Sequence, residues 1–463
     1  MSKSHDSHDP ELSDDSLFQR EADSVYAELL ARIGEADPQP RLAATRRVVE
    51  LLGDPQRAYP IIHITGTNGK TSTSRITESI LRAYGLRTGL LTSPHLVRVN
   101  ERITIDGEPI SNESFVANYR DIQPFLAMVD AELEAAGDAA LSFFEAFTAL
   151  AFASFADAPV DVAVIEVGLG GEWDSTNVGD GDVAVFSPIS LDHIHRLGNT
   201  VEEIARTKAG IIKPSAAVVS ALQEPGVRAE LERASDLREA TLAVEGSAFE
   251  LLSNTIAVGG QVIAVRGLAG TYRDLFLPLF GDHQAHNATL AIAAVESFLG
   301  NGSQALVGDV LAEGLATATS PGRLHVIGVE PTVILDAAHN PAGAESLAKA
   351  LTSYFTFDEI AVVIGVLADK DAHGIIAALH STAAVFLVTA SSSDRAVSAA
   401  ELAEIIRESA ADAVVDEYDV AAEAIAAARD WAQQAPRRAV VVTGSITLIG
   451  DALVIADAEG WSR

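Results

Sequence analysis

The sequence is marked first by the residues and segments that it lacks. None of its 463 residues is a cysteine, which excludes disulfides, thiolate metal sites and a thiol nucleophile. No uninterrupted apolar run is long enough to span a bilayer, and the chain does not start with a charged segment followed by an apolar one. We therefore expect a cytoplasmic protein with no membrane partner.

Basic residues are few relative to acidic ones. Lys and Arg number 32 against 65 Asp and Glu, which gives a formal net charge of −33. A field of this sign disfavours nucleic acids, so we expect no nucleic-acid partner. A phosphate ligand would need positive charge and divalent cations concentrated at its site.

Lysine is the rarest charged residue, with six in the chain. A composition bias towards arginine explains the scarcity. A lysine that persists against this bias can occupy a position where guanidinium cannot replace ammonium chemically. Lys70, Lys208 and Lys370 are candidates for such positions, whereas Lys213 and Lys349 have the surroundings of ordinary surface residues.

A glycine-rich turn follows a β-branched run at residues 61–65 and precedes a segment with helical spacing at 74–84. This order brings backbone N–H groups and a helix N-terminus to one point, the geometry that binds phosphates. The spacing is shorter than the general Walker A pattern, so a tight strand-to-helix turn is the alternative. We predict a nucleotide site in which Lys70 reaches the outer phosphates and Thr71 faces Mg²⁺. The candidate ATP-binding residues of this loop are Thr67, Asn68, Gly69, Lys70, Thr71 and Ser72.

A carboxylate interrupts the buried strand predicted at residues 160–167. Glu166 stands just before a glycine cluster, and a buried carboxylate is costly unless it is paired or metal-bound. His193 lies just past the next strand, and Ser93 lies in a Ser-Pro turn after an earlier one. Carboxylate, imidazole and hydroxyl groups would suit Mg²⁺ or Mn²⁺. A structural histidine and a plain turn are the alternatives.

Two aromatic residues, Phe143 and Phe144, precede Glu145 at the start of a predicted helix that ends near residue 156. The pair either stacks on a planar ring system or faces the core. The residues taken alone favour the core.

Strands and helices alternate along most of the chain, which predicts an α/β protein with two domains. Residues 1–16 contain almost no apolar side chains and are predicted to be a disordered tail. Residues 17–319 are predicted to form the larger domain, with two N-terminal helices and a mainly parallel sheet. Hairpins are expected between residues 242 and 265, with turns at residues 245–246 and 259–260. Residues 320–463 are predicted to form the second domain. Its expected strands are residues 332–335, 360–364, 385–388 and 440–442.

Polar residues follow the first predicted strand of the second domain, where open α/β sheets place their sites. Asp336 is suited to hydrogen-bond a ribose, and His339 to orient a carboxylate or phosphate; Asx-turn chemistry before a helix is the alternative. In the first domain, Asn287 opens a helix and either reads a base edge or caps that helix.

Taken together, these motifs resemble those of the folylpolyglutamate synthase/dihydrofolate synthase family of the Mur ligase superfamily. The resemblance runs from about residue 42 to about residue 450. It rests on residues 65–72, 92–96, 143–145, 166–171, 174–177, 191–193, 208–214, 281–287, 336–343, 365–371 and 443–445.

The resemblance implies a P-loop-type Mur ligase ATPase domain with a mainly parallel sheet and a smaller Rossmann-like C-terminal glutamate-ligase domain. It also implies an ADP-forming ligase that joins L-glutamate to folate or tetrahydrofolate through an acyl phosphate, with a dihydrofolate synthase activity on dihydropteroate. ATP is then a co-substrate, and two Mg²⁺ ions and a monomeric chain are expected.

Site residues follow from the resemblance by position. Lys208 is expected to be carbamylated, which would turn a cation into a metal-bridging carboxylate, and to act with Lys70 and His339 on the reacting groups. The other implied residues are Ser93, Glu166, His193 and Thr71 for Mg²⁺, Asn287, Arg323 and Asp336 for ATP, and Phe143, Phe144 and Glu145 for the folate.

Three positions depart from the family pattern. Glu172 replaces an Arg, His195 replaces an acidic residue, and Thr207 replaces a Glu. Because of these three residues, the family's charge and hydrogen-bond pattern around the expected pterin and metal sites stays an open question for this chain. Glu172 and Thr207 keep open a second function, a catalytically silent nucleotide-binding regulator. A third is a Mur-type peptidoglycan precursor ligase, from which the strings at residues 143–145 and 336–341 distinguish this chain.

Overall fold

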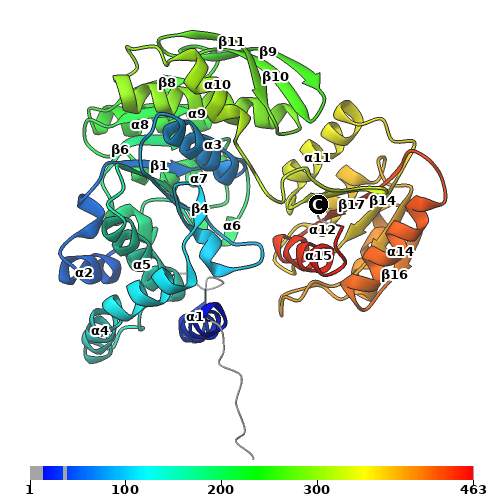
Figure 1. Ribbon diagram of the computed structural model, residues 1–463, viewed down its shortest axis with the longest axis horizontal. Coiled ribbons are helices and arrows are strands. Elements are labelled where there is room, and N and C mark those ends of the chain that lie inside the picture. Colours follow the sequence, from blue (N-terminus) through cyan, green and yellow to red (C-terminus); the bar gives the residue numbers. More distant parts are fainter. Residues whose placement is uncertain (1–13, 35–38, 462–463) are drawn as a thin grey trace, which may run out of the picture.

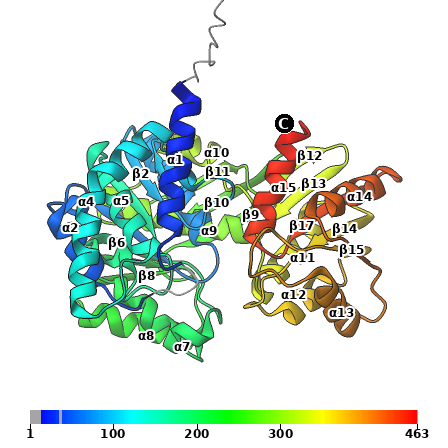
Figure 2. The same ribbon diagram turned by 90° about the horizontal axis from the view of Figure 1, so that it is seen from below.

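The computed structural model describes residues 14–34 and 39–461 (Figure 1). Of the predicted tail, residues 1–13 lie outside this description, and helix α1 (Asp14–Leu30) already begins within the rest. The chain forms two lobes that face each other, each built around its own sheet (Figures 1 and 2).

The first lobe is organised by an eight-stranded sheet in the order β4-β3-β2-β5-β1-β6-β7-β8. The strands from β2 to β8 in this order run parallel, and β3 and β4 form an antiparallel edge. Successive side chains point to opposite faces, so Ile61 packs in one core and Ile62 in the other. The strands are β1 (Ile61–Thr65), β2 (Thr88–Leu91), β3 (Ile103–Ile105), β4 (Glu108–Pro109), β5 (Val162–Glu166), β6 (Gly181–Phe186), β7 (Ala217–Ser220) and β8 (Thr241–Val244).

Helices cover both faces of this sheet, as its apolar strands require. On one face lie α1, α2 (Ala43–Leu51), α4 (Asn112–Ala136) and α5 (Phe143–Asp157). The other face packs against α3 (Lys70–Ala83), α9 (Asp282–Gly300) and α10 (Gly308–Ala316). Shorter helices α6 (Ile194–Leu197), α7 (Val201–Lys208) and α8 (Pro225–Leu237) follow β6 and β7.

A small antiparallel sheet packs near α9 and confirms only part of the predicted hairpins. Its strands are β9 (Glu250–Ala257), β10 (Gly260–Arg266) and β11 (Thr271–Leu277), with a hairpin turn before Gly260. The hairpin predicted at residues 245–246 is wrong, because β8 pairs in parallel with β7 and so belongs to the large sheet.

The second lobe contains a six-stranded sheet in the order β12-β13-β17-β14-β15-β16. Four strands match the prediction, namely β13 (Thr332–Asp336), β14 (Glu359–Ile364), β15 (Val385–Val388) and β17 (Arg438–Thr443). The edge strands β12 (His325–Val329) and β16 (Val415–Glu417) were not predicted; both are short and only partly buried. Helices α11 (Pro341–Tyr354), α12 (Ala372–Leu379) and α13 (Ala399–Ser409) cover one face; α14 (Ala421–Gln433) and α15 (Ile446–Ala458) cover the other.

A cleft of about 1850 Å³ lies between the two lobes. Its walls come from the carboxyl ends of β1, β5 and β6 on one side and of β13, β14 and β17 on the other. We propose that residue 320 begins the second domain, since α10 closes the first lobe and β12 opens the second sheet. No helix in the described ranges has both the length and the apolar character needed to cross a bilayer.

Candidate functional site

The turn between β1 and α3 has the geometry of a phosphate loop. Gly69 has a φ of 86°, and a Cβ on it would lie 2.5 Å from Oδ1 of Asn287, so the position requires glycine. Within the described chain, no side chain caps α3 at Gly69. The first amides of this helix are therefore available to an anionic ligand.

Lys70 is the first residue of α3 and folds back over the loop. Its Nζ donates to the carbonyl oxygens of Gly66 and Thr67, both at 3.3 Å. Burial lowers the pKa of Lys70, and the carboxylates of Glu166 and Asp192 oppose that shift. A partly desolvated ammonium group thus faces the place where phosphates would bind.

Glu166 ends β5 beside the phosphate loop and is only 1% exposed. Its carboxylate accepts from Oγ1 of Thr71 at 2.9 and 3.0 Å and from the backbone N of Ser93 at 3.4 Å. Burial raises the pKa of Glu166, and Lys70 opposes this shift. Ser93 also lines the cleft. A carboxylate and a threonine hydroxyl are oxygen donors of the kind that Mg²⁺ prefers when phosphate oxygens complete the set.

His193 lies in the same cleft, where its imidazole is near Asp192. Its Nε2 is 4.0 Å from Oδ1 of Asp192, and the side chain is 39% exposed. Partial burial and Lys370 lower the pKa of His193 to about 4. In residues 14–34 and 39–461 no group of three or more His, Asp and Glu side chains could hold a metal ion. Glu166 therefore lies beside the Thr71 hydroxyl and the backbone of Ser93. The roles of these residues and of His193 as metal ligands stay predictions.

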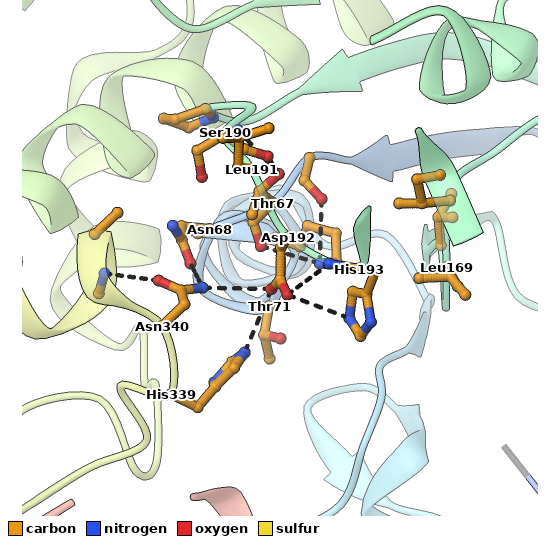
Figure 3. Close-up of a pocket in the computed structure, with 18 of the residues that line it drawn as sticks. Thr67, Asn68, Thr71, Leu169, Ser190, Leu191, Asp192, His193, His339 and Asn340 are labelled. Atoms are coloured by element: carbon orange, nitrogen blue, oxygen red, sulfur yellow. Dashed lines mark hydrogen bonds and ion pairs between the residues drawn. The ribbon is translucent and has the colours of Figure 1, made fainter. Parts of the chain in front are cut away.

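Asp192 connects the two lobes (Figure 3). Its carboxylate contacts Nζ of Lys370 at 3.1 Å, Nδ2 of Asn340 at 3.4 Å and Nε2 of His339 at 3.9 Å. Although burial opposes the shift, Lys370 and two histidines hold the pKa of Asp192 well below its usual range. Asn340 also donates to Oδ1 of Asn68 in the phosphate loop at 3.2 Å. Side chains of the second lobe therefore lie around this carboxylate, at the end of the cleft next to the phosphate loop.

Lys208 ends α7 and is only 4% exposed. Its Nζ donates to the carbonyl oxygen of Gly66 at 2.7 Å. Burial and the nearby charge of Lys70 lower the pKa of Lys208 to about 7. A substantial fraction of this lysine is a neutral, nucleophilic amine at physiological pH.

The second lobe contributes Asp336, at the end of β13, and the loop after it. Asp336 accepts from the backbone N of Leu324 at 2.8 Å and of Ala338 at 2.9 Å, so the Asx turn is present. Nδ1 of His339 donates to the carbonyl oxygen of Ala337 at 2.8 Å, which leaves Nε2 as the acceptor facing Asp192. Arg323 lines the same wall. Asp336 forms this Asx turn and also lines the cleft. The contact of Asp336 with ATP stays a prediction.

Asn287 lies in the second turn of α9, beside Gly69. The cap of this helix is Gly281, so the alternative of Asn287 as a helix cap is wrong. Its Nδ2 donates to Oε1 of Gln284 at 3.1 Å, and Gln284 in turn donates to Ser72 at 3.2 Å. This chain of contacts fixes the amide next to the phosphate loop.

Phe143 and Phe144 lie in different surroundings, one in the core and one at the cleft. Phe143 is 2% exposed and stacks on Phe147 with ring centroids 5.6 Å apart, so it belongs to the core, as the residues alone favoured. Phe144 lines the cleft, where a Cβ on Gly168 would lie 2.6 Å from its ring. Glu145 also lines the cleft, but its carboxylate already accepts from Arg41 at 2.9 Å and from the N-terminus of α5.

The three departures from the family pattern occupy different places. His195 lines the cleft. Glu172 has an exposed side chain that is not part of the cleft wall, and its backbone N donates to the carbonyl oxygen of Thr207 at 2.8 Å. Thr207 donates its hydroxyl to the carbonyl oxygen of Glu203.

Sequence reasoning did not assign Asp192 or Asn340 to the site, and it flagged Lys370 without a role. The scarcity of lysine was the one signal available, and Lys370 is 10% exposed in the cleft. Lys349, at 68% exposed, is the surface residue expected. Lys213 is not, because its side chain is 19% exposed and donates to the carbonyl oxygen of Asn177 at 2.9 Å.

Comparison with known proteins agrees with this geometry. The Mur ligase middle domain model matches residues 64–295, and the Mur ligase glutamate ligase domain model matches residues 322–446. A dihydrofolate synthase/folylpolyglutamate synthase of Mycobacterium tuberculosis is 47% identical over 434 residues, covering 89% of each chain. The chain spans about half the length, 46% and 48%, of two haloarchaeal relatives named as fused to dihydropteroate synthase.

Solved structures give the same result. A folylpolyglutamate synthase from Mycobacterium tuberculosis complexed with ADP superposes with a TM-score of 0.91 at 44% identity, covering 95% of this chain and 98% of that one. An Escherichia coli FolC in complex with DHPP and ADP gives a TM-score of 0.82 at 30% identity, covering 95% and 98%. The fold predicted from the resemblance is confirmed. The chain belongs to the dihydrofolate synthase/folylpolyglutamate synthase family of Mur ligases.

Proposed function

We propose that this chain is an ATP-dependent, ADP-forming ligase that joins L-glutamate to dihydropteroate and to tetrahydrofolates. The observation that carries the proposal is the interlobe cleft. There the phosphate loop, Glu166 and Lys208 face Asp192, which contacts Lys370 and Asn340 of the other lobe. A cleft that collects cations and hydrogen-bond donors in a chain of charge −33 is suited to a polyanionic nucleotide.

In the first step, a carboxylate oxygen of the folate attacks the γ-phosphorus of ATP, and ADP leaves. Lys70 and the open amides of α3 stabilise the charge on the transferring phosphoryl group. Asn287, Arg323 and Asp336 hold the rest of the nucleotide across the cleft. Binding between two lobes keeps water away from the acyl phosphate.

In the second step, the amine of L-glutamate attacks the acyl carbon, phosphate leaves, and an amide forms. His339 has its acceptor nitrogen in the cleft and a pKa lowered by burial to about 4, so it is neutral at physiological pH. It therefore orients the amine as a hydrogen-bond acceptor rather than as a cation.

Mg²⁺ fits the oxygen donors of Thr71 and Glu166 beside the phosphate loop, and Ser93, whose backbone N contacts the same carboxylate, would add its hydroxyl. When bound, such ions neutralise phosphate charge and act as Lewis acids. A carbamate on Lys208 would add a further carboxylate there, and His193 remains a candidate ligand from the cleft wall. Phe144 and Glu145 are proposed to border the folate, with Phe143 supporting them from the core.

A peptidoglycan precursor ligase and a silent nucleotide-binding regulator are the competing functions. The Mycobacterium tuberculosis and haloarchaeal relatives described above carry the names of folate enzymes, and the phosphate-loop lysine and buried Glu166 are present. We also propose that the enzyme is a cytoplasmic monomer.

A phosphate-release assay tests the function. We expect phosphate release with dihydropteroate and with tetrahydrofolate, each only when L-glutamate and Mg²⁺ are present. Release that requires a UDP-muramyl substrate and is absent with both folates would favour the peptidoglycan ligase. ATP binding without release across pteroates, folates and glutamate would favour the regulator.

Glu172→Arg tests the departure with the largest charge change. The Glu172 side chain is exposed and lies outside the cleft wall, so we expect the ratio of kcat/KM for dihydropteroate and tetrahydrofolate to stay unchanged. His195→Asp is the matched comparison, because His195 lines the cleft and a new carboxylate there should alter that ratio. A shifted ratio in Glu172→Arg alone would contradict this expectation.

A further inference from the structure

A leucine of the first lobe contacts the apolar core of the second lobe. Leu96, in the loop after β2, packs against the core formed by β12, β13, β17, α14 and α15. A Cβ on Gly322 would lie 3.4 Å from both methyl carbons of Leu96, and a Cβ on Gly450 would lie 2.1 Å from its carbonyl oxygen. Gly450 is on α15, and Gly322 lies in the segment that links the lobes. We call these two glycines, together with Ile449, the Leu96 socket.

The loop that carries Leu96 is held in one conformation. The carboxylate of Glu101 accepts from the backbone N of Leu96 at 2.8 Å, of Val97 at 3.0 Å and of Arg98 at 2.7 Å. The backbone N of Thr92 donates to the carbonyl oxygen of Arg102 at 3.0 Å, which closes the base of the loop. A displacement of Leu96 therefore moves the whole loop rather than being absorbed within it.

The same loop reaches the end of the cleft where Mg²⁺ is proposed to bind. Ser93 is three residues before Leu96, and its backbone N lies 3.4 Å from Oε2 of Glu166. Glu166 is fixed by Thr71 in the phosphate loop. The loop is thus a short connection between the second lobe and the oxygen donors of the first.

We propose that Leu96 is a positioning residue. It couples the position of the second lobe relative to the first to the position of Ser93 beside Glu166 and Thr71. The inference rests on the proposed function for its activity readout, since a ligase needs both lobes in place before phosphoryl transfer. When the second lobe moves, the socket carries Leu96 with it, and the loop shifts Ser93 towards or away from the donor set. Misplacement of a ligand by about 1 Å is enough to slow catalysis strongly.

Leu96→Ala empties the socket and tests the proposal. We expect kcat to fall by about tenfold and the Mg²⁺ concentration for half-maximal activity to rise by a similar factor. The KM for folate should stay the same. Because these effects depend on the metal, a second readout is the affinity for the non-hydrolysable analogue AMPPCP, measured by calorimetry over a series of Mg²⁺ concentrations. That affinity should lose much of its Mg²⁺ dependence.

Two further variants separate coupling from stability. Leu96→Met refills the socket and should restore kcat and the Mg²⁺ requirement. Gly450→Ala places a Cβ against the carbonyl oxygen of Leu96, and alanine has a higher helix propensity than glycine. It should therefore impair Mg²⁺-dependent binding without weakening α15. The matched control is Val97→Ala, the next residue along the same loop, which is 43% exposed and should behave as wild type.

The outcomes are distinguishable from those of the proposed function. If Leu96→Ala matches Val97→Ala in kcat and in Mg²⁺-dependent AMPPCP binding, the coupling is wrong. It is also wrong if the activity of Leu96→Ala falls only in proportion to its unfolded fraction in thermal melts. If the wild type itself shows no ligase activity, the proposed function fails, and the AMPPCP titration still decides the part of Leu96.

Discussion

Lys70→Ala is expected to lower ATP turnover by about a thousandfold or more, because it removes the cation beside the transferring phosphoryl group. In this protein the loss should be severe, because Nζ of Lys70 lies directly over the loop, 3.3 Å from the carbonyl oxygens of Gly66 and Thr67. Phosphate release in the presence of folate, L-glutamate and Mg²⁺ measures the effect.

The fold should survive this substitution. Burial lowers the pKa of Lys70 in the folded state. A lysine with a lowered pKa destabilises the fold at neutral pH, where the unfolded chain keeps it charged. We therefore expect the Tm of Lys70→Ala to equal or exceed that of the wild type.

Two other lysine substitutions serve as controls for Lys70→Ala. Lys349→Ala removes an exposed lysine paired with Asp282 and should keep full turnover. Lys70→Arg keeps the charge but not the compact ammonium, and it should remain strongly impaired. Near-wild-type turnover in Lys70→Ala would refute the phosphate role.

The phosphate loop could be predicted because its geometry is local. A strand, a glycine turn and a helix in sequence dictate where the amides of residues 66–72 point, whatever the rest of the chain does. Glu166 could be predicted for a related reason, since a carboxylate in an apolar strand needs a partner, and Thr71 and Ser93 provide it.

Contacts between the lobes could not be predicted in the same way. Asp192 and Lys370 are 178 residues apart in sequence, and nothing local to either residue indicates the other. The Leu96 socket depends on two glycines from separate parts of the second lobe. The edge strands β12 and β16 were missed because an edge needs little apolar alternation, and β8 was misassigned because a short strand near a turn pairs according to tertiary context.

Lys208→Ala is the second substitution with a large expected effect, about a hundredfold or more in kcat if the lysine is carbamylated. The unmodified Nζ is buried, close to Lys70 and has a pKa lowered to about 7. Its neutral form is nucleophilic and can add to carbon dioxide, giving a carbamate anion and a proton. The product replaces repulsion from Lys70 with attraction, and the remaining N–H can still donate to the carbonyl oxygen of Gly66.

A carbamate on Lys208 should make the activity sensitive to added carboxylates and to pH. Small carboxylates such as acetate should restore part of the activity of Lys208→Ala by occupying the space that the carbamate leaves. In wild-type enzyme at limiting bicarbonate, activity should rise as pH increases through about 7, because deprotonation exposes the nucleophilic amine. Lys213→Ala, which removes another partly buried lysine of the same segment, should show no rescue. Full activity of Lys208→Ala without added carboxylate would contradict carbamylation, since no other group at that position could then supply the lost anion.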